Sequence, residues 1–162
     1  MRRTYFVLAS LIAGLVVVQA AAIALGFGGL AHHVAQGGTF DKTMMESQES
    51  AFTGDIGFPI HGINGGLVIP LVAIALFAVS FFARFHHAVR WAGLVLGLVI
   101  VQVMLGYSIV DLPYAGAVHG GNALALFATA LLAARAARRA TPGSPRSAAS
   151  EDARLSVGDA TA

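Results

Sequence analysis

The sequence predicts an all-α protein, a bundle of four transmembrane helices in which two helix pairs form a parallel 2+2 repeat. The chain has 162 residues, of which 57% are hydrophobic and only 11% are charged. Soluble domains carry about 25% charged residues. Two similar tetrads, His61-Gly62-Ile63-Asn64 and His119-Gly120-Gly121-Asn122, suggest a duplication. Four apolar segments are each long enough to cross a bilayer, which takes about 20 helical residues. They run at about 5–30, 61–83, 91–110 and 117–134.

All four segments are predicted to be helices, because a backbone exposed to lipid must satisfy its hydrogen bonds within the segment. The first segment follows Arg2 and Arg3 and contains three alanines at 20–22, a pattern also typical of a signal peptide. Its apolar run continues to Leu30, which is too long for a signal sequence, so we expect a retained helix. In the second segment, Pro70 removes one backbone donor and is expected to bend the helix.

The basic residues predict the orientation. Of the ten Lys and Arg residues, only Lys42 falls in a segment that would lie outside if the N-terminus is cytoplasmic. Loops that stay in the cytoplasm carry an excess of Lys and Arg, so both termini are expected to be cytoplasmic. Tyr5 and Trp91 then fall at the inner membrane interface, where aromatic side chains are enriched. The outer loops are acidic and carry Asp41, Glu46, Glu49, Asp55 and Asp111.

Residues 1–140 are expected to form one membrane domain and residues 141–162 a disordered cytoplasmic tail. The tail consists of Ser, Ala, Pro and Gly with mixed charges and has no periodicity. The outer loop, residues 31–60, contains a stretch at 41–50 that is compatible with a short surface helix. A loop of this length is uncommon unless it covers a site or lacks a fixed structure.

The first two helices are expected to repeat as the third and fourth. Residues 15–19 read Leu-Val-Val-Val-Gln and residues 98–102 read Leu-Val-Ile-Val-Gln, and a His-Gly-x-Asn tetrad follows each. Parallel repeats related by an axis along the membrane normal are a known membrane architecture. The repeat predicts that both tetrad histidines lie at the same depth, one turn inside the outer face.

A histidine at a membrane span is a functional-site hypothesis by default. A b-type haem needs two axial imidazoles, an apolar slot for the ring and polar groups for its propionates. His61 and His119 would supply the imidazoles from the second and fourth helices. Asn64 and Asn122 lie on the same helix face as each histidine, so they are candidates to bind the propionates. Glycines beside both histidines would leave a bare surface for the flat ring. They are Gly62, Gly65, Gly66, Gly120 and Gly121.

The alternative interpretation is that these polar residues only join helices. Asn, Gln and His form interhelical hydrogen bonds in membranes that contribute about 1–2 kcal/mol or less each. For Gln19 and Gln102, inside the first and third helices, we favour this interpretation; for the paired histidines both stay open. His86 and His87 lie in a short basic inner loop and are expected to be solvated near acidic lipid headgroups.

A second metal hypothesis concerns the outer side. His32 and His33 follow the first helix, and with Met44 and Met45 they would form a soft copper site. The spacing is loose and crosses a long loop, so this hypothesis is weaker than the haem site; alternatively, one of these histidines would serve as a haem ligand. The chain has no cysteine, which excludes disulfides, iron–sulfur clusters and thiolate metal sites.

The paired tetrads resemble one half of haem A synthase. That family has eight spans built as two four-helix halves, with histidines opening the second and fourth helix of each half near the outer face, and it binds haem through such pairs. His61 and His119 match those positions, and the resemblance covers about residues 5–139. The chain is also similar to small, uncharacterised four-span bacterial membrane proteins that carry His-x-x-Asn on their second and fourth helices.

The chain departs from haem A synthase in three ways. That family has an acidic residue just before the first ligand histidine of its catalytic half, whereas residues 57–60 here are Gly-Phe-Pro-Ile. Many members have a cysteine pair in the first outer loop, which this chain lacks, and only one half is present. These differences bear on catalysis more than on haem binding, so enzymatic activity stays an open question.

The sequence therefore predicts a multi-pass protein of the bacterial inner membrane with one haem b, ligated by His61 and His119, in electron transfer or haem handling. Two histidines fill both axial positions, which favours electron transfer over oxygen chemistry. The implied partner is a redox protein or respiratory complex, and a homodimer would rebuild an eight-helix body. Nucleic-acid binding is not expected, because the basic residues flank membrane segments. The alternative is a non-enzymatic membrane subunit or assembly factor whose His, Asn and Gln residues serve helix packing.

Overall fold

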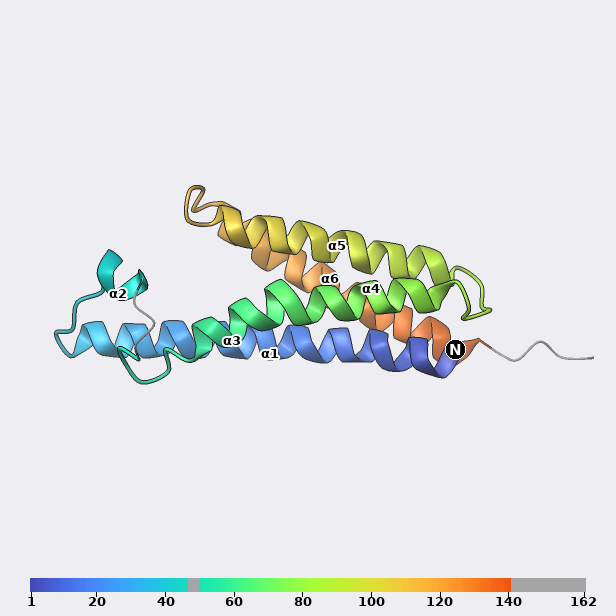
Figure 1. The fold of residues 1–162 in the computed structure, drawn as a ribbon, viewed down its shortest axis with the longest axis horizontal. Coiled ribbons are helices and arrows are strands. Elements are labelled where there is room, and N and C mark those ends of the chain that lie inside the picture. The colour runs from blue at the N-terminus through green and yellow to red at the C-terminus, as the bar shows by residue number, and fades with distance from the viewer. Residues whose placement is uncertain (47–49, 141–162) are drawn as a thin grey trace, which may run out of the picture.

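The computed structural model describes residues 1–46 and 50–140, and this part of the chain is all-α, with no strand. The predicted tail at 141–162 lies outside the described residues. The elements follow one another as helical rods joined by loops (Figure 1). They are α1 (Arg2–Ala35), α2 (Lys42–Glu46), α3 (Gly57–Ile63), the π-helical segment η1 (Asn64–Val68), α4 (Ile69–Ser80), α5 (Ala88–Ser108) and α6 (Ala115–Arg139).

Four helical rods of the described chain are long and apolar enough to cross a membrane, as expected for an integral membrane protein. They are Arg2–Ala35, Gly57–Ser80, Ala88–Ser108 and Ala115–Arg139. Each contains most of one predicted segment, but the predicted bounds were wrong by up to five residues. The second rod begins at Gly57 instead of His61, because Pro59 falls in the first helical turn, where its missing N–H has no cost. Residues 31–35, expected to open the outer loop, instead continue α1.

The second rod is continuous through Pro70 even though proline lacks an N–H. Asn64–Val68 form a π-helical turn, and Pro70 follows in the first turn of α4. A π turn spaces the backbone hydrogen bonds by one extra residue, which accommodates the donor that proline lacks. The chain thus continues from α3 to α4 as one rod (Figure 1).

The helices form a four-membered ring. α1 packs against α6 and against the rod α3–α4, and α5 packs against α4 and α6. The helices that carry the two tetrads, α3 and α6, therefore stand diagonally opposite each other. We call the end that holds Arg2, Arg84 and Arg139 the arginine-rich end, and the end with the loop at residues 36–56 the loop end. At the loop end α1 projects beyond α5 and α6 (Figure 1). Its 34 residues span about 51 Å, against about 30 Å of hydrocarbon.

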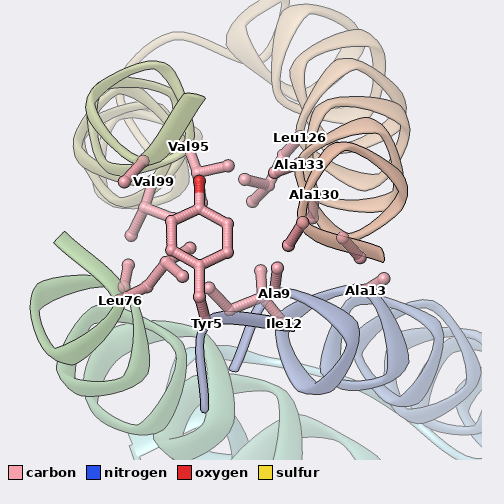
Figure 2. Close-up of a cluster of buried hydrophobic side chains, with 14 of the residues drawn as sticks. Tyr5, Ala9, Ile12, Ala13, Leu76, Val95, Val99, Leu126, Ala130 and Ala133 are labelled. Carbon is pink, nitrogen blue, oxygen red and sulfur yellow. The ribbon is translucent and has the colours of Figure 1, made fainter. Parts of the chain in front are cut away.

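The packed core occupies only the half of the bundle toward the arginine-rich end. Its side chains come from all four rods (Figure 2), and its largest fully buried member, Tyr5, is 0% exposed. The Tyr5 hydroxyl donates a hydrogen bond to the Ala88 carbonyl oxygen at 3.0 Å. Tyr5 is therefore a core residue, which corrects the expectation that it faces the membrane interface. The largest fully buried side chains are Tyr5, Ile12, Leu76, Leu126, Val95 and Val99.

The described part of the loop, residues 36–46 and 50–56, contains the short helix α2. The predicted surface helix within 41–50 is found as α2, residues Lys42–Glu46, and an exposed ion pair joins Lys42 to Glu46 at 3.6 Å. The Asp55 carboxylate accepts hydrogen bonds from the Ala51 and Phe52 backbone N–H groups at 2.6 and 3.4 Å. The pKa of Asp55 is lowered, and the hydrogen bond from the Ala51 N–H is the largest cause. This carboxylate thus closes the turn by which the chain re-enters the bundle at α3.

Candidate functional site

The two tetrad histidines meet between diagonally opposite helices. His61 lies on α3 and His119 on α6, and both are partly exposed. Their ring centroids are 6.1 Å apart, and the ring planes make an angle of 51°. Residues separated by 58 positions in the sequence are thus brought together as a facing pair, as the sequence predicted.

One ring nitrogen of each histidine is held by a backbone carbonyl on the neighbouring helix. His61 Nδ1 lies 3.1 Å from the Gln19 carbonyl oxygen, and His119 Nδ1 lies 3.2 Å from the Gln102 carbonyl oxygen. A carbonyl oxygen only accepts hydrogen bonds, so Nδ1 must carry the proton in both rings. In a neutral imidazole the other nitrogen, Nε2, then has a free lone pair. Metal-ligating histidines are oriented by the same kind of bond from their second nitrogen.

The two asparagines bond to a neighbouring helix through their side-chain amides. Asn64 Nδ2 donates to the Leu15 carbonyl oxygen and to Gln19 Oε1, both at 3.0 Å. Asn122 Nδ2 donates to the Leu98 carbonyl oxygen at 3.0 Å and to Gln102 Oε1 at 2.6 Å. An amide has two N–H groups, and both are used here. In this structure neither amide has a free N–H for a propionate, the ligand group predicted for both asparagines. The structure shows the interhelical packing contacts that were favoured for Gln19 and Gln102.

These contacts correspond residue by residue in the two halves of the bundle. In each half, the histidine contacts the backbone carbonyl of one glutamine. The asparagine three residues after that histidine binds the side chain of the same glutamine and the backbone carbonyl of the leucine four residues before the glutamine. The matched stretches at 15–19 and 98–102 contain both acceptor pairs. The glutamine that ends both matched stretches, Gln19 and Gln102, was the sequence signal that could have identified these carbonyls.

The glycines of the tetrads differ in what surrounds them. A Cβ added at Gly62, Gly120 or Gly121 would meet no atom within 4 Å, so these positions border open space. Gly65, predicted to leave room for the ring, instead borders the Gln19 side-chain amide, and any Cβ there would overlap Gln19 Nε2. The bare surface of Gly65 is thus occupied by a residue of α1, whereas that of Gly121 is open.

The Asn–Gln contacts predict a measurable stability effect. Asn64→Ala removes both donors and leaves Gln19 Oε1 without this partner, so we expect the free energy of unfolding to fall by about 0.5–2 kcal/mol. Ser108→Ala is the matched control, because the Ser108 hydroxyl bonds only within its own helix, to the Met104 carbonyl at 2.9 Å. Unfolding in mixed detergent–SDS micelles measures both variants. Equal stability of the two would show that Asn64 does not hold η1 to α1.

The outer copper hypothesis stays a prediction, because the side chain of Met45 lies outside the described part of the structure. Within the described residues, no three His, Cys, Asp or Glu side chains gather in a way that would hold a metal ion. His33 Nε2 lies 3.2 Å from the Thr39 carbonyl oxygen, and its ring stacks on Phe52 with centroids 5.4 Å apart. Through these two contacts, His33 connects the end of α1 to the loop.

His86 and His87 lie in the loop at the arginine-rich end, as predicted, and their ring centroids are 3.5 Å apart. His87 adopts a left-handed backbone conformation with φ of 64°. Desolvation, followed by the positive charges of His86 and Arg90, lowers the pKa of His87. The lowered pKa favours the neutral form of His87.

No match is found when the chain is compared with models of known protein families, with curated proteins or with solved structures. The function is therefore inferred from the geometry of the histidine pair and its hydrogen-bonded neighbours.

Proposed function

We propose that this chain is a bis-histidine haem b protein of the bacterial inner membrane that serves electron transfer or haem handling. The observation that carries the proposal is the His61–His119 pair, with centroids 6.1 Å apart and each Nδ1 held by a glutamine carbonyl. Both rings keep an Nε2 lone pair, which is the donor that a haem iron accepts.

The centroid distance matches two imidazoles on opposite sides of one metal. With a metal–nitrogen bond of about 2.0 Å and about 1.1 Å from the nitrogen to the ring centre, two such rings have centres about 6.2 Å apart. The 51° angle between the ring planes is compatible with this, because each ring can rotate about its metal–nitrogen bond. The donor set and its spacing therefore fit one six-coordinate iron.

The packing around the pair also favours a flat ligand. The core cluster of buried side chains ends before the histidines along every rod, and open space borders Gly62, Gly120 and Gly121. A macrocycle needs an apolar slot beside its ligand residues, and we propose that it would lie next to these glycines. Bound haem would supply one-electron redox chemistry. The chain would hold the iron through His61 and His119 and leave no axial position open to oxygen.

The matched contacts in the two halves support the proposed parallel 2+2 repeat, in which α1 corresponds to α5 and the rod α3–α4 to α6. The distribution of basic residues supports a cytoplasmic arginine-rich end. The histidine pair would then lie toward the outer face, where it would exchange electrons with a partner on that side. The likeness to one half of haem A synthase rests on the same pair of positions.

The proposal predicts a coloured protein. Full-length chain purified in mild detergent from haem-supplied cells is expected to contain one haem b per chain, with the absorption spectrum of low-spin, six-coordinate iron. Absorption spectroscopy with extraction and quantification of the haem measures this. A well-folded chain without a Soret band under these conditions would exclude the proposal and leave a packing role. The Asn64–Gln19 and Asn122–Gln102 bonds favour that second candidate, a non-enzymatic membrane subunit.

A further inference from the structure

A groove runs along one face of α5 near the arginine-rich end. Its volume is about 490 Å³, and it is lined by Arg90, Gly93, Leu94, Gly97 and Leu98. These residues recur at spacings of three and four, so they form a single stripe on the helix. The two glycines make the floor, and a Cβ added at Gly97 would meet no atom within 4 Å. The groove is thus an open, apolar channel with one cation among its lining residues.

The described charged residues around Arg90 are all positive. At the arginine-rich end the described chain carries seven arginines, and its described acidic residues all lie at the loop end. Within the described residues the one ion pair between side chains is Lys42–Glu46, far from this groove. Arg90 is exposed and has no carboxylate partner there. An anionic group that is not among the described residues is the natural complement to this site.

The dimensions of the groove suit a lipid chain. Leu98 lies eight residues after Arg90, which is about 12 Å of helix and shorter than one leaflet of a core about 30 Å thick. The cation stands at the start of α5, beside the loop that holds Arg84, and the apolar floor extends from it toward the bilayer centre. A negative headgroup would occupy the charged end of the groove at Arg90, and an acyl chain would occupy the apolar floor along Gly93 and Gly97.

A second copy of the chain is a less favourable occupant. Helices that associate through glycines four residues apart cross at those glycines. Arg90 lies three residues before Gly93 on the same face, so a dimer related by a two-fold axis would bring two like charges together at one end of the contact. Neither arginine would find a carboxylate among the described residues of that end. The charge of the groove therefore favours an anion over another copy of the same surface.

We propose that the groove on α5 binds one acyl chain of an anionic phospholipid whose phosphate pairs with Arg90. This site is separate from the histidine pair and does not depend on haem. It would fix the depth of α5 in the membrane and thereby the depth of the rods that α5 contacts.

The test uses full-length protein and two defined lipids, phosphatidylglycerol and phosphatidylcholine, with native mass spectrometry to count bound lipids and protein copies. Wild type is expected to retain one phosphatidylglycerol per chain in preference to phosphatidylcholine. Arg90→Gln is expected to lower that affinity about fivefold, the effect of one cation near an anionic headgroup. Arg3→Gln, which removes an exposed arginine from α1, is the matched control and should change affinity less than twofold.

A second variant fills the groove without altering charge. Gly97→Leu is expected to abolish retention of the lipid, while Gly14→Leu on α1, another glycine with no atom within 4 Å of an added Cβ, should leave it unchanged. Circular dichroism confirms folding of both. Equal retention of the two lipids, or unchanged retention in Gly97→Leu, would overturn the proposal. So would a wild-type dimer that Gly97→Leu converts to monomers, because the occupant would then be a second copy.

Discussion

Replacing either His61 or His119 by alanine is expected to abolish haem b binding and the Soret band. The two rings face each other at 6.1 Å as one site, and the removal of one ring leaves the iron with a single protein ligand beside open space. Because each axial bond holds the same iron, we expect both single variants to lose as much haem as the double variant. Absorption spectra and haem content per chain, measured on purified protein, check this.

Three controls separate ligation from damage to the fold. His86→Ala and His32→Ala remove histidines outside the pair and should keep the full complement of haem. Added imidazole is expected to restore part of the band in His61→Ala, because a free ring would enter the space that the side chain vacates. Full haem content in both single variants would refute ligation by this pair, whatever else binds haem in the chain.

Replacing Gly57 by alanine is expected to cause a large loss of stability in the loop-end half. Gly57 is buried where α3 begins, and an added Cβ would overlap the Ala22 carbonyl oxygen and lie 2.6 Å from the Gly26 backbone nitrogen. Both are main-chain atoms of α1 and have no rotamer by which to move away. Overpacking of this kind costs about 1–3 kcal/mol or more. Because His61 follows four residues later, haem content should fall as well.

Gly28→Ala is the matched control for this prediction. Gly28 lies on α1 two residues after Gly26, but an added Cβ there meets no atom within 4 Å. We expect its free energy of unfolding to equal that of wild type or to rise slightly, since alanine favours helix over glycine. Unfolding in mixed micelles compares the two variants. If Gly57→Ala is as stable as Gly28→Ala, the close approach of α3 to α1 is not required.

The number and type of the helices could be predicted from the sequence because lipid allows few alternatives. An apolar run of about 20 residues has to satisfy its own backbone, and a helix does so. The facing of His61 and His119 could be anticipated because two similar tetrads on the second and fourth helices imply equivalent positions. In these respects the local pattern and the tertiary arrangement agree.

The partners of the polar side chains could not be predicted in the same way. Whether Asn64 faces a ligand or Gln19 depends on how far α3 is rotated about its axis and how closely it approaches α1. That approach is set by Gly57 and Gly65, whose missing side chains admit α1 backbone and the Gln19 amide. From the sequence alone, Gly65 was interpreted as space for the haem ring. A glycine in the sequence indicates that another group approaches closely, but it does not identify that group.

The helix ends were missed for a simpler reason. Apolar runs stop where charged or polar residues begin, whereas helices continue into them: α1 includes His32 and His33, and α6 extends through Arg138 and Arg139. Arginine side chains can reach the membrane surface while their backbone stays helical. No pattern in the sequence before Pro70 indicated the π-helical turn at Asn64–Val68.

The confinement of the buried core to one half of the bundle has a consequence for the order of assembly. Tyr5 and the side chains around it hold all four rods together without any contribution from the histidine pair. Under the proposed function, the apoprotein would be able to fold and keep its topology before haem arrives, unlike small metal domains that are unfolded without their ion. Loading would then be a local event at the loosely packed end, where amide protons are expected to exchange fastest and to slow once haem is inserted.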